Sequence, residues 1–116
     1  MSHIFKNGSI KEIGILTDWI DIGNDINYQV IEYEDYYDIT VITRTYRDSN
    51  GDGPSLANIP SPYRPSKEVR FAVGYDMPYS KAGFGKITTG GDIYLYNQSG
   101  YSTNCFSNFS YKAKKS

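Results

Sequence analysis

The sequence predicts an all-β protein, a small antiparallel barrel or sandwich of about six to eight short strands. Eleven glycines and five prolines interrupt the 116-residue chain, and no window keeps apolar residues at helical spacing for long. Aromatic residues make up 16% of the chain, and twelve of them are tyrosines. The mean hydropathy is only −0.54. This combination suits strands with one face in water better than packed helices.

The N-terminal half is expected to begin with an ambiguous segment and to continue with a hairpin. Residues 9–23 allow a short strand or a single helical turn, with Trp19 as the buried anchor. The β-branched and aromatic runs at 28–33 and 38–47 then predict two strands. The acidic residues 34–38 between them predict the hairpin loop.

Turn-forming residues at 47–60 are expected to interrupt the strand pairing. After them, residues 67–74 predict a half-buried strand, because apolar and polar side chains alternate there. The inward face would carry Val69, Phe71 and Val73, and the wet face Glu68 and Arg70. A polar loop is expected at 75–83, and the last strand is expected at 104–113, before a solvated tail.

Residues 84–97 predict a tight hairpin whose register decides which side chains are wet. A two-residue loop of the two glycines would pair Ile87 with Tyr94. A three-residue loop that adds the following aspartate would pair Ile87 with Leu95. The second register gathers the aliphatic side chains on one face and leaves Lys86, Tyr94 and Tyr96 together on the other.

Charge and composition exclude several classes of function. Twelve basic residues oppose thirteen acidic ones, so no basic field indicates a nucleic acid or an anionic membrane as a partner. No apolar run is long enough for membrane insertion or a secretory signal, so a soluble protein made in the cytoplasm is expected. A lone cysteine and a lone histidine argue against a disulfide, a His-based metal cluster and a nucleophilic triad. Cys105 is expected to be a small buried apolar group, and His3 lies in the terminal segment.

Two further motifs have both a chemical and a structural interpretation. The segment 48–53 matches the first half of a calcium loop, but Ile59 stands where the bidentate glutamate belongs, so a turn is expected and no metal or cofactor. The acidic residues of the first hairpin offer paired carboxylates for glycoside hydrolysis, although such a cluster is more simply a solvated loop. They are Glu32, Glu34, Asp35 and Asp38.

The tyrosine surplus points to a binding surface. A tyrosine ring stacks on the C–H face of a sugar, and its hydroxyl forms hydrogen bonds with it. Tyr94 and Tyr96 beside Lys86, with Tyr75 and Asp76 in the neighbouring loop, would suit a polyol or a phosphate-bearing glycan. The alternative is tyrosine packing across strands or a subunit interface.

The second half of the chain resembles the tip domain of phage tail fibres and receptor-binding proteins. The shared features are an Ile-Pro step and a Tyr-Arg-Pro-Ser element within IPSPYRPSKEVRFAV (59–73), and a Gly-x-Gly-x-Ile strand and Thr-x-Gly turn within GFGKITTGGDIYLYN (83–97). LTDW (16–19) and the strand region 26–45 resemble the paired strands that precede these elements. The size and order are most similar to the head domain of lactococcal phage receptor-binding proteins.

The resemblance implies a homotrimer of β-barrel heads in the virion, at a tail tip or baseplate beside other tail proteins. Residues 1–18 would form a connecting segment, and 19–116 the head. The head would bind cell-wall saccharide of a Gram-positive host through Lys86, Tyr94, Tyr96 and Asn108. Pro60, Pro62 and Pro65 would stiffen a connection between sheets.

We therefore expect a receptor-binding domain that attaches to its host without catalysis and gains avidity from several copies. A structural tail or baseplate module without glycan binding is one alternative. A polysaccharide-degrading tail enzyme is the other.

Overall fold

A computed structural model describes residues 14–48, 55–76 and 81–115, and in these residues the protein is all-β with no helix. All the strand pairs are antiparallel and belong to one sheet with the order β1-β3-β4-β9-β6-β7-β8-β5, and β2 also pairs with β3. The strands of the described residues are β1 (Ile15–Leu16), β2 (Ile20–Asp21), β3 (Ile26–Glu32), β4 (Tyr36–Arg47), β5 (Ala57–Asn58), β6 (Val69–Tyr75), β7 (Ala82–Ile87), β8 (Asp92–Leu95) and β9 (Thr103–Lys114). The predicted all-β class is confirmed.

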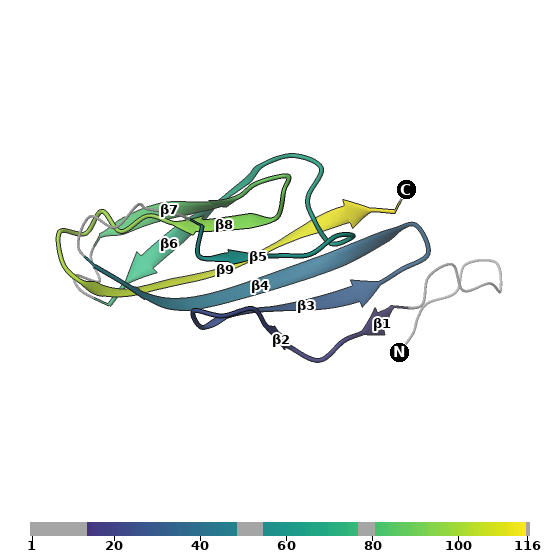
Figure 1. Cartoon of the computed structure of the whole chain (residues 1–116), viewed down its shortest axis with the longest axis horizontal. Coiled ribbons are helices and arrows are strands. Elements are labelled where there is room, and N and C mark those ends of the chain that lie inside the picture. Colours follow the sequence, from purple (N-terminus) through teal and green to yellow (C-terminus); the bar gives the residue numbers. More distant parts are fainter. Residues whose placement is uncertain (1–13, 49–54, 77–80, 116) are drawn as a thin grey trace.

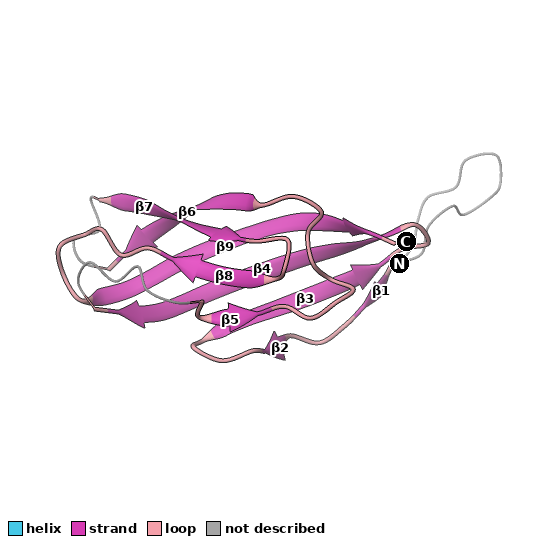
Figure 2. Cartoon of the chain, turned by 45° about the horizontal axis from the view of Figure 1, so that its top comes forward, coloured by secondary structure: helices cyan, strands magenta, loops and turns pink. Residues whose placement is uncertain are grey.

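The sheet is curled into a half-barrel. β4 and β9 pair along their whole length of 12 residues, so the expectation of short strands throughout is wrong for these two. β6 meets β9 only where Gly74 and Tyr75 pair with Phe106 and Cys105. Beyond this junction the two strands diverge, and β6, β7 and β8 fold over the long strands (Figures 1 and 2).

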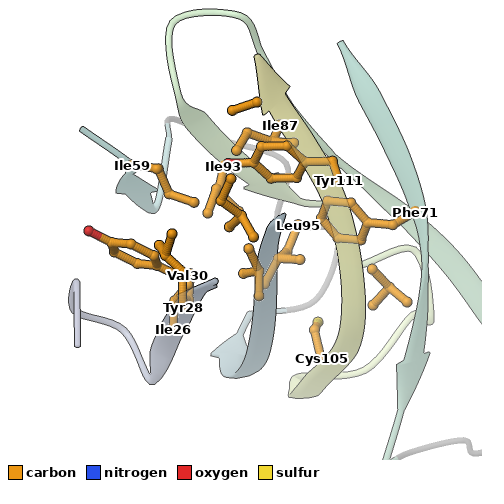
Figure 3. Packing of buried hydrophobic residues seen from close by; sticks show 14 of the residues in the cluster. Ile26, Tyr28, Val30, Ile59, Phe71, Ile87, Ile93, Leu95, Cys105 and Tyr111 are labelled. Atoms are coloured by element: carbon orange, nitrogen blue, oxygen red, sulfur yellow. The ribbon is translucent and has the colours of Figure 1, made fainter. Parts of the chain in front are cut away.

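The core fills the inside of the curl, and Figure 3 shows its side chains converging from both halves of the sheet. Period-two alternation produces it, because every second residue of each strand points inward. The largest apolar side chains with almost no exposure are Ile26, Val30, Ile39, Val41, Ile59, Val73, Ile87, Ile93 and Leu95. Cys105 is buried among them, as expected. Inward-facing Phe71 stacks on Phe109 with ring centroids 3.8 Å apart.

The N-terminal segment differs from expectation. It forms two strands of two residues each, β1 and β2, and Trp19 between them is 45% exposed. The prediction of a buried anchor is therefore wrong. Both short strands pair with β3 at the margin of the sheet, and the inward side chains of β3, such as Tyr28, already fill the core. Ile15 and Leu16 also belong to this sheet, so the sheet contains residues on both sides of the predicted boundary between 1–18 and 19–116. That division into a connecting segment and a head stays a prediction.

The first hairpin is present, but its turn is shorter than the acidic run suggested. Only residues 33–35 separate β3 from β4, and the Tyr33 amide donates to the Tyr36 carbonyl at 2.9 Å. Tyr36 and Tyr37 therefore belong to β4 and not to a loop. Tyr37 packs against the core, with its ring edge-on to Tyr63 at 5.0 Å. This packing accompanies a strand that begins at Tyr36, two residues before its predicted start at residue 38.

The proline-rich connection links β5 to β6, and β5 itself lies in the stretch expected to be unpaired. Pro65 is buried, whereas Pro60 and Pro62 are exposed. The connection is attached to the rest of the fold because the Tyr111 hydroxyl donates to the Tyr63 carbonyl at 2.6 Å. All three prolines therefore lie in a connection that the fold holds in place.

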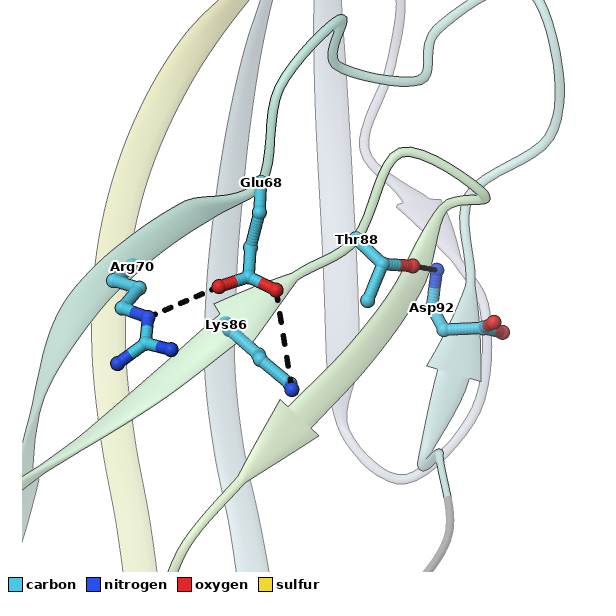
Figure 4. Close-up of polar contacts among 5 residues, drawn as sticks. All are labelled: Glu68, Arg70, Lys86, Thr88 and Asp92. Carbon is cyan, nitrogen blue, oxygen red and sulfur yellow. Dashed lines mark hydrogen bonds and ion pairs between the residues drawn. The ribbon is translucent and has the colours of Figure 1, made fainter.

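The β7–β8 hairpin adopts neither predicted register. Ile87 pairs with Ile93 and Lys86 with Tyr94, around a turn at 89–91. The observed pairing is displaced by two residues from the three-residue alternative, so each side chain keeps the face predicted there. The Thr88 amide donates to the Asp92 carbonyl at 3.0 Å. The Asp92 amide donates to the Thr88 hydroxyl at 3.2 Å (Figure 4). With these bonds the turn begins at Thr89, whereas both predicted loops begin at Gly90.

Other expectations divide between confirmation and correction. The strand over 67–74 and its inward face are confirmed, as is the last strand. Tyr75, expected in a loop, ends β6 and is only 4% exposed. His3 and the calcium-like motif after Asp48 lie outside the described residues.

Candidate functional site

The outer face of β6, β7 and β8 carries a continuous row of aromatic and basic side chains. The register places Arg70 opposite Lys86, and Lys86 opposite Tyr94. Because outward positions recur every second residue, Phe84 and Tyr96 lie on the same face. We call the set Arg70, Phe84, Lys86, Tyr94 and Tyr96 the cation–aromatic strip.

Ring contacts connect the members of the strip. The Arg70 guanidinium carbon lies 5.7 Å from the Phe84 ring centroid, and Phe84 packs on Tyr96 at 4.7 Å. The rings of Tyr96 and Tyr94 are nearly parallel, 7° apart, with centroids 6.3 Å apart. Lys86 Nζ lies 5.2 Å from the Tyr94 centroid. The strip is thus a connected surface in which the ring contacts run from Arg70 to Lys86, two cations that are themselves opposite each other in the register.

Glu68 lies between the two cations (Figure 4). Its Oε2 accepts from Arg70 Nε at 3.0 Å, and its Oε1 lies 3.9 Å from Lys86 Nζ. One carboxylate therefore orients both basic groups, and one positive charge remains in excess. The Arg70 side chain is 65% exposed and that of Lys86 26%, so Arg70 is the more accessible of the two basic groups.

Tyr75 supports the strip from inside. Its hydroxyl donates to the Tyr96 carbonyl at 2.8 Å and accepts from the Gln98 amide at 3.1 Å. The buried ring faces the core, so the structure places it beneath the strip and not on the surface. Asp76 is exposed, and its carboxylate accepts from the Asn104 side chain at 3.0 Å, at the start of β9.

Asn108 lies on a different part of the outer face. It is exposed on β9 opposite Ile42 of β4, and β6 and β7 separate β9 from β8 in the sheet. The structure thus brings together Lys86, Tyr94 and Tyr96 of the six predicted residues. Sequence reasoning missed Phe84 as a ring on this outer face, although its parity with Lys86 was a sufficient signal.

The four carboxylates of the acidic hairpin lie along the end of β3, its turn and the start of β4. Glu32 pairs with Lys115 at 2.8 Å, and this hydrogen bond raises the pKa of Lys115. Asp38 lies opposite Lys112 in the sheet register. Within the described residues, no group of three or more His, Cys, Asp or Glu side chains is placed to hold a metal ion.

The fold and surface together define a class of protein: one curled antiparallel sheet with a cation–aromatic strip on its outer face. No protein-family model matches the chain, and no curated protein matches it in sequence. In the part of the chain that the structure describes, no helix is long and apolar enough to span a membrane.

Proposed function

We propose that this chain is a non-enzymatic domain that binds cell-surface saccharide. The observation that supports the proposal is the cation–aromatic strip, in which Tyr94 and Tyr96 offer nearly parallel rings beside the two basic groups. Aromatic faces stack on the C–H faces of sugar rings, and charged groups and phenol hydroxyls form hydrogen bonds with their oxygens.

The biological setting that we propose is the tail tip or baseplate of a phage that infects a Gram-positive host. The support is the resemblance of residues 59–97 to receptor-binding tip domains, together with the half-barrel fold. In this setting the domain acts as a homotrimer beside other tail proteins. Three copies multiply weak single-site affinities into avidity.

The binding test is to replace Tyr94 and Tyr96 with alanine. Both side chains lie on the outer face and are half-buried, so the variant is expected to fold. Adsorption to immobilised cell-wall polysaccharide from Gram-positive bacteria should weaken by at least about tenfold, since two stacking contacts are lost. The matched control is Tyr101→Ala, which removes a ring that is 51% exposed elsewhere. Unchanged adsorption of the folded double variant would exclude this site, and release of reducing sugar would contradict the non-enzymatic part.

The oligomeric state has its own test. Light scattering at several concentrations should give the mass of a trimer. A strict monomer across that range would contradict trimerisation through this domain, while leaving the saccharide site to the adsorption experiment.

A structural tail module is the second candidate, because large apolar side chains are exposed along the N-terminal segment. Ile15 is 64% exposed, Leu16 59% and Trp19 45%. Contacts with another protein would cover such residues. This candidate predicts that Trp19→Ala impairs assembly into tails, whereas the tyrosine double variant has no effect on adsorption.

A further inference from the structure

The last strand has one edge that the sheet leaves open. β9 pairs with β4 along one side, from Thr103 to Lys114. On its other side it pairs with β6 only at Cys105 and Phe106. Figures 1 and 2 show β9 running on toward the C-terminus while β6 lies apart from it. Beyond this junction, one long edge of β9 therefore has no neighbouring strand among the described residues.

The hydrogen bonds on either side of β9 show which backbone groups point to this edge. The Lys115 amide donates to the Asp35 carbonyl of the first hairpin at 3.0 Å, so odd-numbered residues direct their backbone groups toward β4. On the opposite side, the Asn104 carbonyl accepts from the Asp76 amide at 3.3 Å. Even-numbered residues therefore direct their N–H and C=O groups to the open edge. Beyond the junction these residues are Asn108, Ser110 and Lys112.

This edge is accessible as well as unpaired. In the part of the chain that the structure describes, no residue forms a hydrogen bond with the backbone groups of Asn108, Ser110 or Lys112. Their side chains are exposed. An unpaired strand edge is a template for an extended segment, because each new bond satisfies a donor and an acceptor. The open edge of β9 can therefore accept one more strand.

The outer face of the edge favours acidic residues in such a strand. Lys112 and Lys114 are exposed there, and within the described residues neither forms an ion pair. Lys112 Nζ lies 4.8 Å from the Tyr36 ring centroid, and the register places Asp38 opposite Lys112 on β4. Two lysines beside one carboxylate leave an excess of positive charge. Acidic side chains on an added strand would pair with it across the strands.

The inner side of the edge favours apolar residues. Phe109 is half-buried and stacks on Phe71 of β6 with ring centroids 3.8 Å apart. Tyr111 follows on the same side of β9 and is buried. Every second side chain of an added strand would lie on this side. A strand that fits both sides thus alternates acidic residues with apolar ones.

A second copy of β9 fits this edge less well than such a strand. Antiparallel pairing of two β9 edges would bring together Lys112 and Lys114 from each copy. Like charges on neighbouring strands destabilise their pairing, and lysine on an edge strand commonly prevents self-association. The same charges favour a partner strand of opposite sign.

We propose that the open edge of β9 binds an extended segment of another protein, in which acidic and apolar residues alternate, as an added antiparallel strand. The interaction does not rest on saccharide binding, because the cation–aromatic strip lies on other strands. In antiparallel pairing, residues opposite each other share a face of the sheet. The acidic residues that face Lys112 are therefore the ones whose amides donate to β9.

The test uses the full chain and a dye-labelled synthetic peptide of about eight residues that alternates glutamate and valine, followed by fluorescence anisotropy. This peptide should bind, whereas a peptide that alternates lysine and valine should not. N-methylation of the glutamates should abolish binding, because it removes the amides that face β9. N-methylation of the valines should leave binding unchanged, because their amides face away from it.

Variants of the edge provide the second arm of the test. Ser110→Pro removes an N–H of the open edge without removing a bond to β4, and such a position tolerates proline. It should weaken peptide binding at least about tenfold. Ser110→Ala is the matched control, which keeps the amide and should bind as the unchanged protein does. Lys112→Glu combined with Lys114→Glu should lose the glutamate peptide and gain the lysine peptide, which tests the edge even if the proline variant does not fold.

Three outcomes would overturn the proposal: no binding of the glutamate peptide, binding that survives N-methylation of its glutamates, or an unchanged peptide preference after the two lysines are reversed. Light scattering without peptide adds a fourth. A lower mass for folded Ser110→Pro would identify a second copy as the occupant of the edge. Saccharide adsorption should be unchanged in all these variants, so failure of the edge is distinguishable from failure of the strip.

Discussion

Individual residues decide where the chain can turn, and Gly91 is the clearest case. Its φ is +88°, in the region that side chains disfavour. A Cβ at this position would also collide with the carbonyl of Ile59 and lie 3.0 Å from Arg64 Nε. These two constraints have different origins, because the first is conformational and the second comes from the connection that follows β5.

Comparison with Gly23 separates the two constraints. Gly23 has a φ of +97°, but nothing lies within 4 Å of a Cβ built there. We expect Gly23→Ala to cost about 1 kcal/mol of unfolding free energy, and Gly91→Ala to cost about 1–3 kcal/mol more. Urea unfolding of both variants measures the difference. Equal losses would show that the contact with Ile59 places no constraint on the turn.

Among the elements, the β4–β9 pair is the longest, and its inward face is partly polar. The hydroxyls of Thr43 and Ser107, which are paired in the register, lie 2.7 Å apart and are buried. A buried hydroxyl costs free energy if its partner is removed, but removal of both partners is nearly neutral. The pair therefore specifies the alignment of these strands more than it adds stability.

A double-mutant cycle tests this interpretation. Thr43→Val should cost about 1–3 kcal/mol, because it removes the partner of the buried Ser107 hydroxyl. Ser107→Ala should cost less, because the Thr43 hydroxyl keeps the Cys105 carbonyl as an acceptor at 3.5 Å. The double variant should cost less than Thr43→Val alone, because it removes both hydroxyls, so the coupling should be about 1–3 kcal/mol. Thermal or urea unfolding of the four proteins measures this coupling. Strict additivity would mean that the two hydroxyls do not stabilise each other.

For the whole molecule, the curl encloses ionisable groups in the core. Burial raises the pKa of the Cys105 thiol from its ordinary value of 9.0 to about 11. Burial likewise raises the pKa of Tyr111, whose hydroxyl donates to the Tyr63 carbonyl. In both cases the folded protein retains a proton that the unfolded chain loses more readily.

Stability should therefore decline in alkaline solution. As the pH rises from about 9 to about 11, the unfolded chain releases the Cys105 proton while the folded state keeps it, so the free energy of unfolding falls. Cys105→Ala should make this decline shallower, because the tyrosines remain in both proteins. Urea unfolding at several pH values between 8 and 11 provides the comparison. Identical pH profiles for the two proteins would contradict a contribution from the thiol.

Local alternation made some of these features predictable. The inward face of β6, the burial of Cys105 and the shared outer face of Lys86, Tyr94 and Tyr96 all follow from a period of two along a strand. The hairpin register was not predictable in the same way. A displacement by two residues keeps every side chain on its face, so the hydrophobic pattern does not distinguish the alternatives.

The sequence by itself determined the all-β class and the side of the sheet on which the residues of the strip lie, because both depend on neighbours along the chain. Only the tertiary structure decided that Tyr75 is buried beneath Tyr96, that Trp19 is exposed, and that Asn108 lies apart from the strip. These outcomes depend on which strands become neighbours and where the sheet bends. Contacts between strands far apart in the sequence settle both, and no local pattern encodes them.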